Sequence, residues 1–240
     1  MKTTLVSLFT LVAINIHASL SIGSKGTVVL YQNTSQYSGQ NGEGAFMMYS
    51  PQINGGAGTL TLCVQPDVGF MPGSGNQYSF IVNSGSVGST VGVDTKDPFT
   101  GAPMNSLTIG TAYLFSQFSA GTLAGFDYTY GRGFTQSATD LEDAINSLQG
   151  YGPATGGGVY FVDLAEQKLD LNAAGVMKNA NGAYDVGVLN LYYPDGDVAQ
   201  NQLVMMTPVS EASTWIWGCL TLAVVGGGIA KNRMKNGQDL

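Results

Sequence analysis

The chain has 240 residues and a formal net charge of −7 at pH 7; between Ser19 and Pro208, fourteen acidic side chains outnumber five basic ones. An acidic surface repels phosphate backbones, so nucleic acid is excluded as a partner. The one histidine, His17, lies close to the N-terminus, and of the two cysteines only Cys63 lies outside the apolar C-terminal segment. Outside the two ends, these counts exclude histidine-dependent catalysis, an intramolecular disulfide and a histidine or thiolate metal site. We expect no metal and no cofactor.

The N-terminus has the layout of a secretory signal. Lys2 precedes an apolar run from Leu5 to Ile16, and the small residue Ala18 follows. The run is too short to span a bilayer, which takes ~20 residues. We therefore expect residues 1–18 to be a signal peptide, which the Sec translocon recognises and signal peptidase removes before Ser19.

The next part of the chain reads as strands and turns. Runs rich in β-branched and aromatic residues, separated by glycine-rich turns, predict strands in the first 82 residues. These are Gly26–Tyr31, Ala45–Tyr49, Thr59–Val64 and Gln77–Val82. Gly, Ser and Pro punctuation over residues 84–103 predicts a loop.

Two helices are predicted in the middle of the chain. One covers Ile109–Phe118. The other is marked by Thr139 and Glu142, which have the spacing of a capping box, and by apolar residues that repeat with a helical period. The apolar residues are Leu141, Ala144, Ile145 and Leu148. We expect this helix to begin near Thr139 and to end at Gly150.

The last third returns to strands. Tyr184–Tyr193 and Asn201–Thr207 flank Asp195-Gly196, a strong signal for a β-hairpin. The predicted fold class is α+β, mainly antiparallel β with two helices in the middle, in one exported domain that covers residues 19–208.

Residues 209–240 form a tail with three parts. A short polar motif precedes an uncharged apolar segment, residues 215–230, and three bases follow. Trp215 and Trp217 suit the lipid–water interface, and bases after the segment favour a cytoplasmic C-terminus. The segment is short but can span a membrane if its flanks anchor in the headgroups. The motif consists of Val209, Ser210, Glu211, Ala212, Ser213, Thr214 and Trp215.

This tail resembles the PEP-CTERM sorting signal of Gram-negative envelope proteins. Glu211, Ser213, Thr214 and Trp215 match the usual motif, whereas Ser210 and Ala212 replace its two prolines. The resemblance implies processing by an exosortase-type membrane enzyme, and an association with exopolysaccharide and biofilm matrix. Short motifs between residues 60 and 208 also look like a body shared by many such proteins. They are Ala112–Phe118, Gly121–Leu123, Leu141–Ile145, Val188–Tyr192 and Gln202–Val204.

A second resemblance concerns bacterial thioester adhesin domains. These carry a cysteine on an early strand and, on a later helix, a glutamine in a Gln-x-Ala-Ile-Trp-like stretch. Cys63 matches the cysteine, but Glu142 replaces the glutamine and Asn146 the tryptophan. A thioester forms when a thiolate attacks an amide and expels ammonia, and a carboxylate resists this attack. We therefore expect Cys63 and Glu142 to form no thioester.

Other candidate groups have ordinary structural interpretations. The pairs Asp94/Asp97 and Asp195/Asp197 could bind Ca²⁺, but aspartate in such loops is more typical of turns. Three further acids could be glycosidase carboxylates, but their position is more typical of a helix N-terminus. They are Asp140, Glu142 and Asp143. Tyrosines that could stack on sugars more often pack in a sheet. They are Tyr128, Tyr130, Tyr192 and Tyr193.

The sequence thus favours a non-catalytic protein of the cell envelope or extracellular matrix, anchored in the membrane through its tail, with exopolysaccharide as a possible partner. Two alternatives stay open: a carbohydrate-binding or adhesin module, and a carboxylate-dependent glycan hydrolase.

Overall fold

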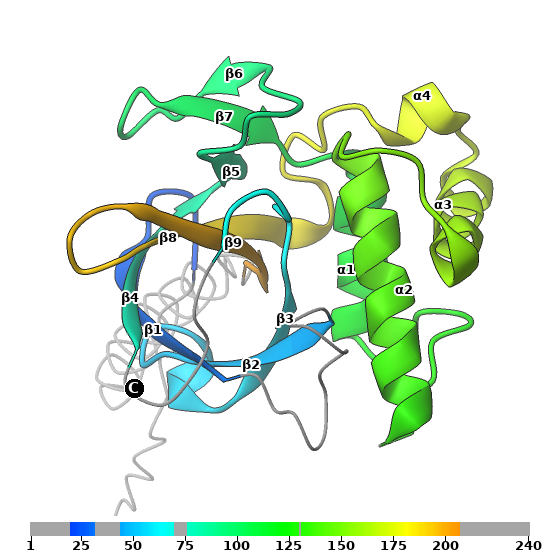
Figure 1. Ribbon diagram of the computed structural model, residues 1–240, viewed down its shortest axis with the longest axis horizontal. Helices are drawn as coiled ribbons and strands as arrows, with labels where there is room; N and C mark the ends of the chain where they lie inside the picture. Colours follow the sequence, from blue (N-terminus) through cyan, green and yellow to red (C-terminus); the bar gives the residue numbers. More distant parts are fainter. Residues whose placement is uncertain (1–19, 32–43, 70–75, 130, 207–240) are drawn as a thin grey trace, which may run out of the picture. The chain divides into compact units, whose positions relative to one another are not determined.

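The computed structural model describes residues 20–31, 44–69, 76–129 and 131–206, which belong to one compact unit. Its largest element is a six-stranded antiparallel sheet with the order β3-β2-β1-β4-β8-β9 (Figure 1). The strands are β1 (Lys25–Tyr31), β2 (Ala45–Tyr49), β3 (Thr59–Leu62), β4 (Gln77–Asn83), β8 (Val186–Tyr192) and β9 (Val198–Met205).

The two outer strands of this sheet meet, so the sheet closes into a barrel. Cys63, directly after β3, forms an antiparallel bridge with Gln202 of β9. The Val64 N–H donates to the Asn201 carbonyl at 3.2 Å, and the Thr61 hydroxyl donates to the Leu203 carbonyl at 2.6 Å. We call this junction of β3 and β9 the seam.

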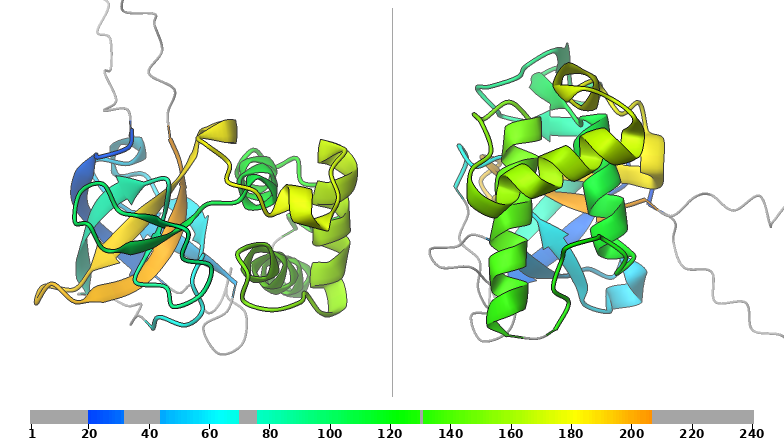
Figure 2. Two further views of the ribbon diagram at one scale, coloured as in Figure 1. Left: turned by 90° about the horizontal axis from the view of Figure 1, so that it is seen from above. Right: turned by 90° about the vertical axis from the view of Figure 1, so that its right-hand side faces the viewer.

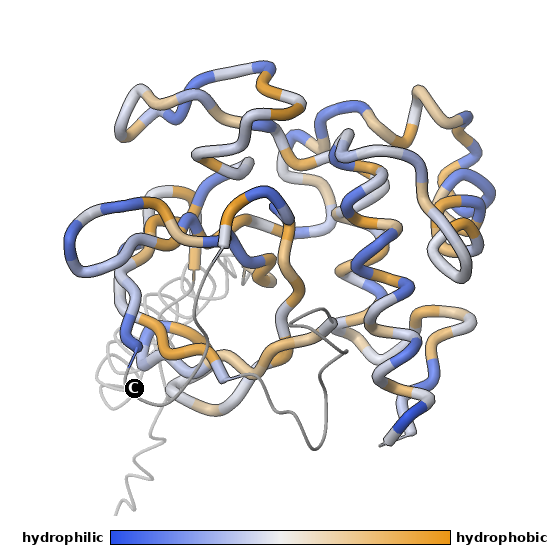
Figure 3. The backbone as a smooth tube through the Cα atoms, viewed as in Figure 1, coloured by the Kyte–Doolittle hydropathy of each residue, from blue (hydrophilic) through white to orange (hydrophobic). Residues whose placement is uncertain are grey.

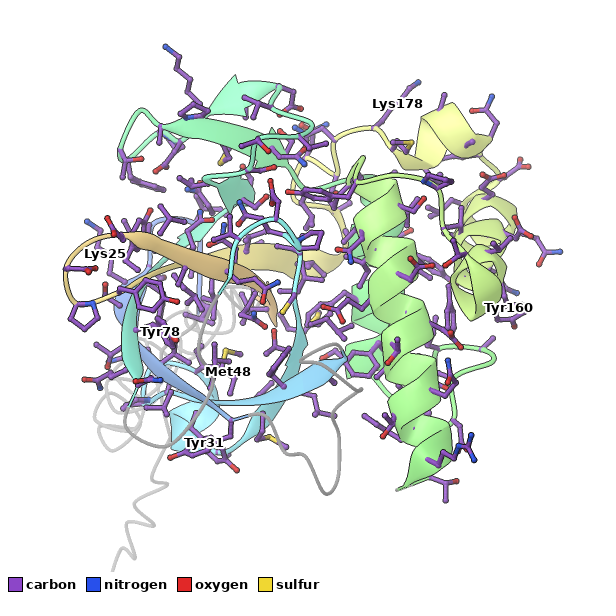
Figure 4. The ribbon with its side chains drawn as sticks, viewed as in Figure 1. Lys25, Tyr31, Met48, Tyr78, Tyr160 and Lys178 are labelled. Carbon is purple, nitrogen blue, oxygen red and sulfur yellow. The ribbon has the colours of Figure 1, made fainter. Side chains whose placement is uncertain are left out.

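The inside of the barrel is filled by apolar side chains. On β4 every second residue points inward, namely Tyr78, Phe80 and Val82, as the two-residue period of a strand requires. Figure 4 shows Met48 and Tyr78 within the barrel. The same cluster contains Leu30, Phe46, Cys63, Leu189, Leu191 and Val204.

A small three-stranded sheet lies beside the barrel. It has the order β5-β7-β6, with β5 (Gly85–Val87), β6 (Thr95–Lys96) and β7 (Pro103–Ser106). The amide of Asn190 on β8 joins the two sheets: its oxygen accepts from the Val87 N–H at 2.9 Å, and its nitrogen donates to the Gly85 carbonyl at 3.2 Å. One buried side chain thus replaces two backbone partners.

Four helices form a layer against one side of the barrel (Figure 2). They are α1 (Ile109–Ser119), α2 (Arg132–Leu148), α3 (Gly156–Leu169) and α4 (Ala173–Val176). Their apolar faces form a second core with outward side chains of the barrel, including Leu62, Val64, Val188 and Leu203. Hydrophobic and hydrophilic positions alternate along α2 in Figure 3, as expected for a helix that is buried on one face. Two short 3₁₀ turns, Asn54–Gly56 and Ala183–Asp185, complete the described elements.

The expected fold class is confirmed in its main feature, the antiparallel β structure, but the number of helices is wrong. The described residues contain four helices instead of two. Helix α3 begins with three glycines, which are poor helix formers. Residues 84–103, expected to be a loop, contain β5 and β6 and the first residue of β7.

The predicted start of α2 is also wrong. The helix begins seven residues before Thr139, whose hydroxyl donates to the Thr135 carbonyl inside the helix at 3.1 Å. Phe134 and Ala138 are buried and extend the apolar face of Leu141 toward the N-terminus. Because they pack in the second core, this packing outweighs the weak helix propensity of Gly133 and Thr135.

Among the described residues, no helix is both long and apolar enough for a membrane span. The predicted signal peptide, residues 1–18, and the predicted membrane segment, residues 215–230, lie outside the described residues.

Candidate functional site

Cys63 lies at the seam and is buried, with 1% of its surface exposed. The last paired residues of β2 and β3 are Ala45 and Leu62, so Gly44 and Cys63 occupy the next position, just beyond the ladder. Two glutamines of β9 flank the sulfur. Cys63 Sγ donates to Gln200 Oε1 at 3.0 Å, and Gln202 Nε2 donates to Cys63 Sγ at 3.1 Å.

Glu142 reaches the same place from α2. Glu142 is only 6% exposed, and its neighbours Leu141 and Ile145 are core residues. The helix therefore buries a carboxylate beside an apolar face. Its Oε2 accepts from the Gly44 N–H at 2.5 Å. This backbone N–H lies just beyond the β2–β3 ladder, and the buried carboxylate satisfies it. The structure thus brings Cys63 and Glu142 together.

The surroundings of Cys63 keep its thiol protonated. Burial is the largest effect and raises the pKa of the thiol well above its usual value, and the negative charge of Glu142 raises it further. A hydrogen bond to Glu142 acts in the same direction, while the hydrogen bond from Gln202 opposes it. Because the thiolate is the nucleophilic form, Cys63 is a poor nucleophile in this site.

The site also offers no suitable acyl group for the sulfur. Glu142 presents a carboxylate, which repels a thiolate and lacks a good leaving group. Gln200 and Gln202 do carry amides, but each meets the sulfur with a hydrogen-bonding edge of the amide. The arrangement therefore suits a neutral thiol held between hydrogen-bonding groups.

A network of buried amides continues from this site along the seam, and the sequence alone did not reveal it. Asn201 Nδ2 donates to Gln65 Oε1 at 2.7 Å and to the Val87 carbonyl at 2.8 Å. Asn201 Oδ1 accepts from the Leu191 N–H at 3.0 Å, next to a register shift between Leu189 and Leu191. The alternation of Cys63 with Gln65 and of Gln200 with Gln202 was a signal for polar side chains around the sulfur, but no local pattern pointed to Asn201.

Asp97 and Asp195 stabilise turns, and Asp94 connects a loop to strand β7. Asp97 is 1% exposed and accepts from Asn83 Nδ2 at 2.7 Å, from the Phe99 N–H at 3.0 Å and from the Thr100 hydroxyl. Burial alone would raise its pKa, but these hydrogen bonds outweigh it and lower the pKa. Asp94 accepts from the Ser106 N–H at 3.0 Å, and Asp195 from the Asp197 N–H at 3.2 Å. Within the part of the chain that the structure describes, no three acidic, histidine or cysteine residues could hold a metal.

Of the three carboxylates considered for glycan hydrolysis, Asp140 and Asp143 lie against the first glycines of α3, whereas Glu142 reaches the seam. They lie in the middle of α2, so their expected place at a helix N-terminus is wrong. Asp140 accepts from Gln136 Nε2 at 3.0 Å, and Asp143 accepts from the Thr155 N–H at 2.6 Å, at the start of α3. Glu142 alone reaches the seam, and a pair of carboxylates across a cleft, as glycosidases need, is absent from this group.

The described tyrosines singled out for sugar binding are engaged within the fold. The Tyr128 hydroxyl accepts from the Leu123 N–H at 3.1 Å, and its ring packs on Phe126 with centroids 4.7 Å apart. Tyr193 packs on Tyr78 at 5.2 Å, and the hydroxyl of Tyr192 is buried. Tyr130 lies outside the described residues, as do all seven residues of the predicted sorting motif.

Comparisons with known proteins identify no relative. No family model matches the chain, and neither a curated protein nor a solved structure matches it.

Proposed function

We propose that this chain is a non-catalytic protein of the cell envelope or extracellular matrix, exported by its N-terminal signal and held in the membrane by its C-terminal tail. The observation that carries the non-catalytic part is the Cys63–Glu142 site. The only nucleophilic thiol of the domain is buried, has a raised pKa and faces a carboxylate. Covalent capture of a ligand through a thioester needs an amide at position 142, so the proposed role is structural or adhesive without a covalent bond.

The export and sorting part is supported by the residues of the two ends. The charge, apolar run and small residue of the N-terminus suit the Sec translocon and signal peptidase. The motif from Val209 to Trp215, the apolar segment and the bases after it suit an exosortase-type enzyme, and the acidic domain between the ends suits uncharged or cationic partners of the matrix.

The test of this proposal follows the location of the protein in a Gram-negative host. The full chain should fractionate with the envelope, and a chain that stops at Pro208 should be released into the periplasm or medium. A chain in which Lys178, an exposed base of the domain, is changed to Gln is the matched control and should behave as the full chain does. Equal cell association of the full and truncated chains would contradict the anchoring role of the tail.

Mass spectrometry of the mature protein tests the non-catalytic site directly. We expect the mature protein to have the mass calculated from its sequence, with Cys63 and Glu142 unmodified. The Cys63→Ala variant should likewise have the mass calculated from its own sequence. A loss of water or ammonia that disappears in Cys63→Ala would overturn the proposed chemistry of this site.

A further inference from the structure

A hollow that is broadly open to solvent lies on the outer side of the helical layer. It has a volume of about 700 Å³, within the ~300–1,000 Å³ of ordinary ligand sites, and it follows α3 and the turn into α4. Its walls come from Tyr160, Asp163, Leu164, Glu166, Gln167, Asp170, Leu171 and Asn172. From Tyr160 to Leu169, the last residue of α3, the helix extends over about 14 Å, at ~1.5 Å per residue.

An aromatic ring is held open at one end of this hollow. Tyr160 is 48% exposed, the largest exposed fraction among the described tyrosines that are classed as exposed. Its ring packs edge-to-face on Phe161 with centroids 5.3 Å apart, and a methyl group at Gly125 would overlap it. The ring is therefore fixed from behind while much of it stays accessible, and Figure 4 shows Tyr160 projecting from α3.

The polar groups of the hollow are also available. The side chains of Asp163, Glu166 and Gln167 form no hydrogen bond to another described residue. The hollow contains three carboxylates, those of Asp163, Glu166 and Asp170, and the dipole at the C-terminal end of α3 adds negative potential near Glu166 and Asp170. None of its described walls carries a base, although Lys168 is on the same helix.

These features select a cationic ligand with hydroxyl groups. An ammonium group is attracted both by carboxylates and by the face of a tyrosine ring. The amide side chain of Gln167 can pair with neutral hydroxyls, whereas Asn172 Oδ1 already accepts from the Gly175 N–H at 2.9 Å. A basic peptide would be expected to use an apolar anchor pocket, whereas Leu171 is the one exposed large apolar side chain besides Tyr160.

We propose that this hollow binds an amino-sugar oligosaccharide whose amines are free and protonated, with Tyr160 against an amine-bearing ring and Asp163, Glu166 and Asp170 around the charge. The inference deepens the proposed function and rests on it for its setting, since an exported domain meets envelope glycans. No bond forms or breaks, because the interaction is reversible binding.

Isothermal titration calorimetry of the full chain, purified in a mild detergent, tests this site. The probe is a short, fully de-N-acetylated glucosamine oligosaccharide. We expect saturable binding that weakens with salt, and at least tenfold weaker binding of the N-acetylated oligosaccharide of the same length, because that ligand lacks the charge.

Two variants locate the site. Tyr160→Ala should weaken binding about tenfold and Asp163→Asn about threefold, since one removes the ring and the other one of three charges. Tyr31→Ala, which removes a comparably exposed ring from the barrel, should bind as the unchanged protein does. Thermal unfolding should be the same for all three proteins within about 2 °C, because each change is on the surface.

The inference would be overturned by no binding of the glucosamine probe, by equal binding of the N-acetylated probe, or by equally tight binding of oligolysine. Unchanged binding by Tyr160→Ala would overturn it as well. The outcome is separable from that of the proposed function. A chain that binds the probe but is not delivered to the envelope would support this site and contradict the export proposal. A chain in the envelope that binds no probe would contradict the site alone.

Discussion

Two sides of the barrel are built in different ways. Where β1, β4 and β8 lie together, each pair of strands shares a ladder of five residue pairs, and apolar side chains fill the interior. At the seam, β3 and β9 share a single bridge, and side chains supply the remaining hydrogen bonds. Backbone hydrogen bonds between strands hold most of the barrel together, and hydrogen bonds of buried thiol, hydroxyl and amide groups hold the seam. Because the junction is short, its buried polar groups need side-chain hydrogen-bond partners. These side chains lie at the same place as the Cys63 thiol and the Glu142 carboxylate.

The side of the barrel formed by β1, β4 and β8 should lose the most stability on mutation. Phe80→Ala removes a ring that is 1% exposed, and the closed interior cannot collapse around the space. We expect a loss of about 3–5 kcal/mol in the free energy of unfolding, measured by urea denaturation. Phe99→Ala, at an exposed position, is the control and should cost less than about 1 kcal/mol. Equal losses in the two variants would mean that the barrel interior is not the main core.

Alkaline pH should act on the seam. The pKa of the Cys63 thiol is raised in the folded protein, while the unfolded chain keeps the ordinary value of 9.0. The stability linked to this group is thus complete below pH 9 and is lost as the pH rises from there toward the folded pKa. The slope is about 1.4 kcal/mol per pH unit in that range. Subtracting the curve of Cys63→Ala isolates the thiol, because raised tyrosine pKa values affect both proteins alike. Parallel curves for the two proteins above pH 9 would contradict the raised pKa.

The hydroxyl at the seam should contribute less. Thr61→Val keeps the shape of the side chain but removes the donor to the Leu203 carbonyl, which stays buried without this bond. We expect a loss of about 1–2 kcal/mol, measured by urea denaturation. Thr27→Val on β1, which lies outside the seam, is the matched control and should change stability by less than about 0.5 kcal/mol. A neutral Thr61→Val would show that the bridge alone closes the barrel.

The smallest effect on stability, and the most informative chemically, is expected for Glu142→Gln. The new side chain keeps an oxygen for the Gly44 N–H, so the cost should stay below about 1 kcal/mol. It also removes the charge that helps raise the pKa of Cys63 and supplies an amide. We expect intact-mass spectrometry to show a loss of about 17 Da, the ammonia expelled when the thiol acylates. The double variant with Cys63→Ala should show no loss, and an unchanged mass in the single variant would mean that the carboxylate is not what prevents a thioester.

The difference between the two sides of the barrel also decides what the sequence could predict. The strands β1, β2 and β4 were predicted within one residue, because their runs of β-branched and aromatic residues are separated by glycine-rich turns. The hairpin of β8 and β9 followed from Asp195-Gly196, where Gly196 has a φ of 94° that glycine adopts at no steric cost. Closure at the seam could not be predicted, because it depends on Cys63 meeting Gln202, far away in the chain.

The helical layer was harder to predict for another reason. Thr139 and Glu142 satisfy the capping-box pattern, yet Thr139 is inside α2 and Glu142 is buried against the barrel. A local sequence pattern does not show that Phe134 and Ala138 pack in a hydrophobic core formed with distant residues. The pairing of Cys63 with Glu142 came from a resemblance between two short stretches, whereas the amides of Gln65 and Asn201 around it became visible only in three dimensions.

Closure of the barrel affects how strongly copies of the domain aggregate at high local concentration. A sheet with open edges presents unpaired N–H and C=O groups that can recruit the same edge of another molecule and seed aggregates. Here the outer strands of the main sheet, β3 and β9, meet through the bridge at Cys63 and the side-chain hydrogen bonds of the seam, and the other outer edges among the described strands are β5 and β6, of three and two residues. Such short edges, one of them carrying Lys96, offer little template for polymerisation. Crowded copies of this domain should therefore stay separate and leave their outer surfaces accessible.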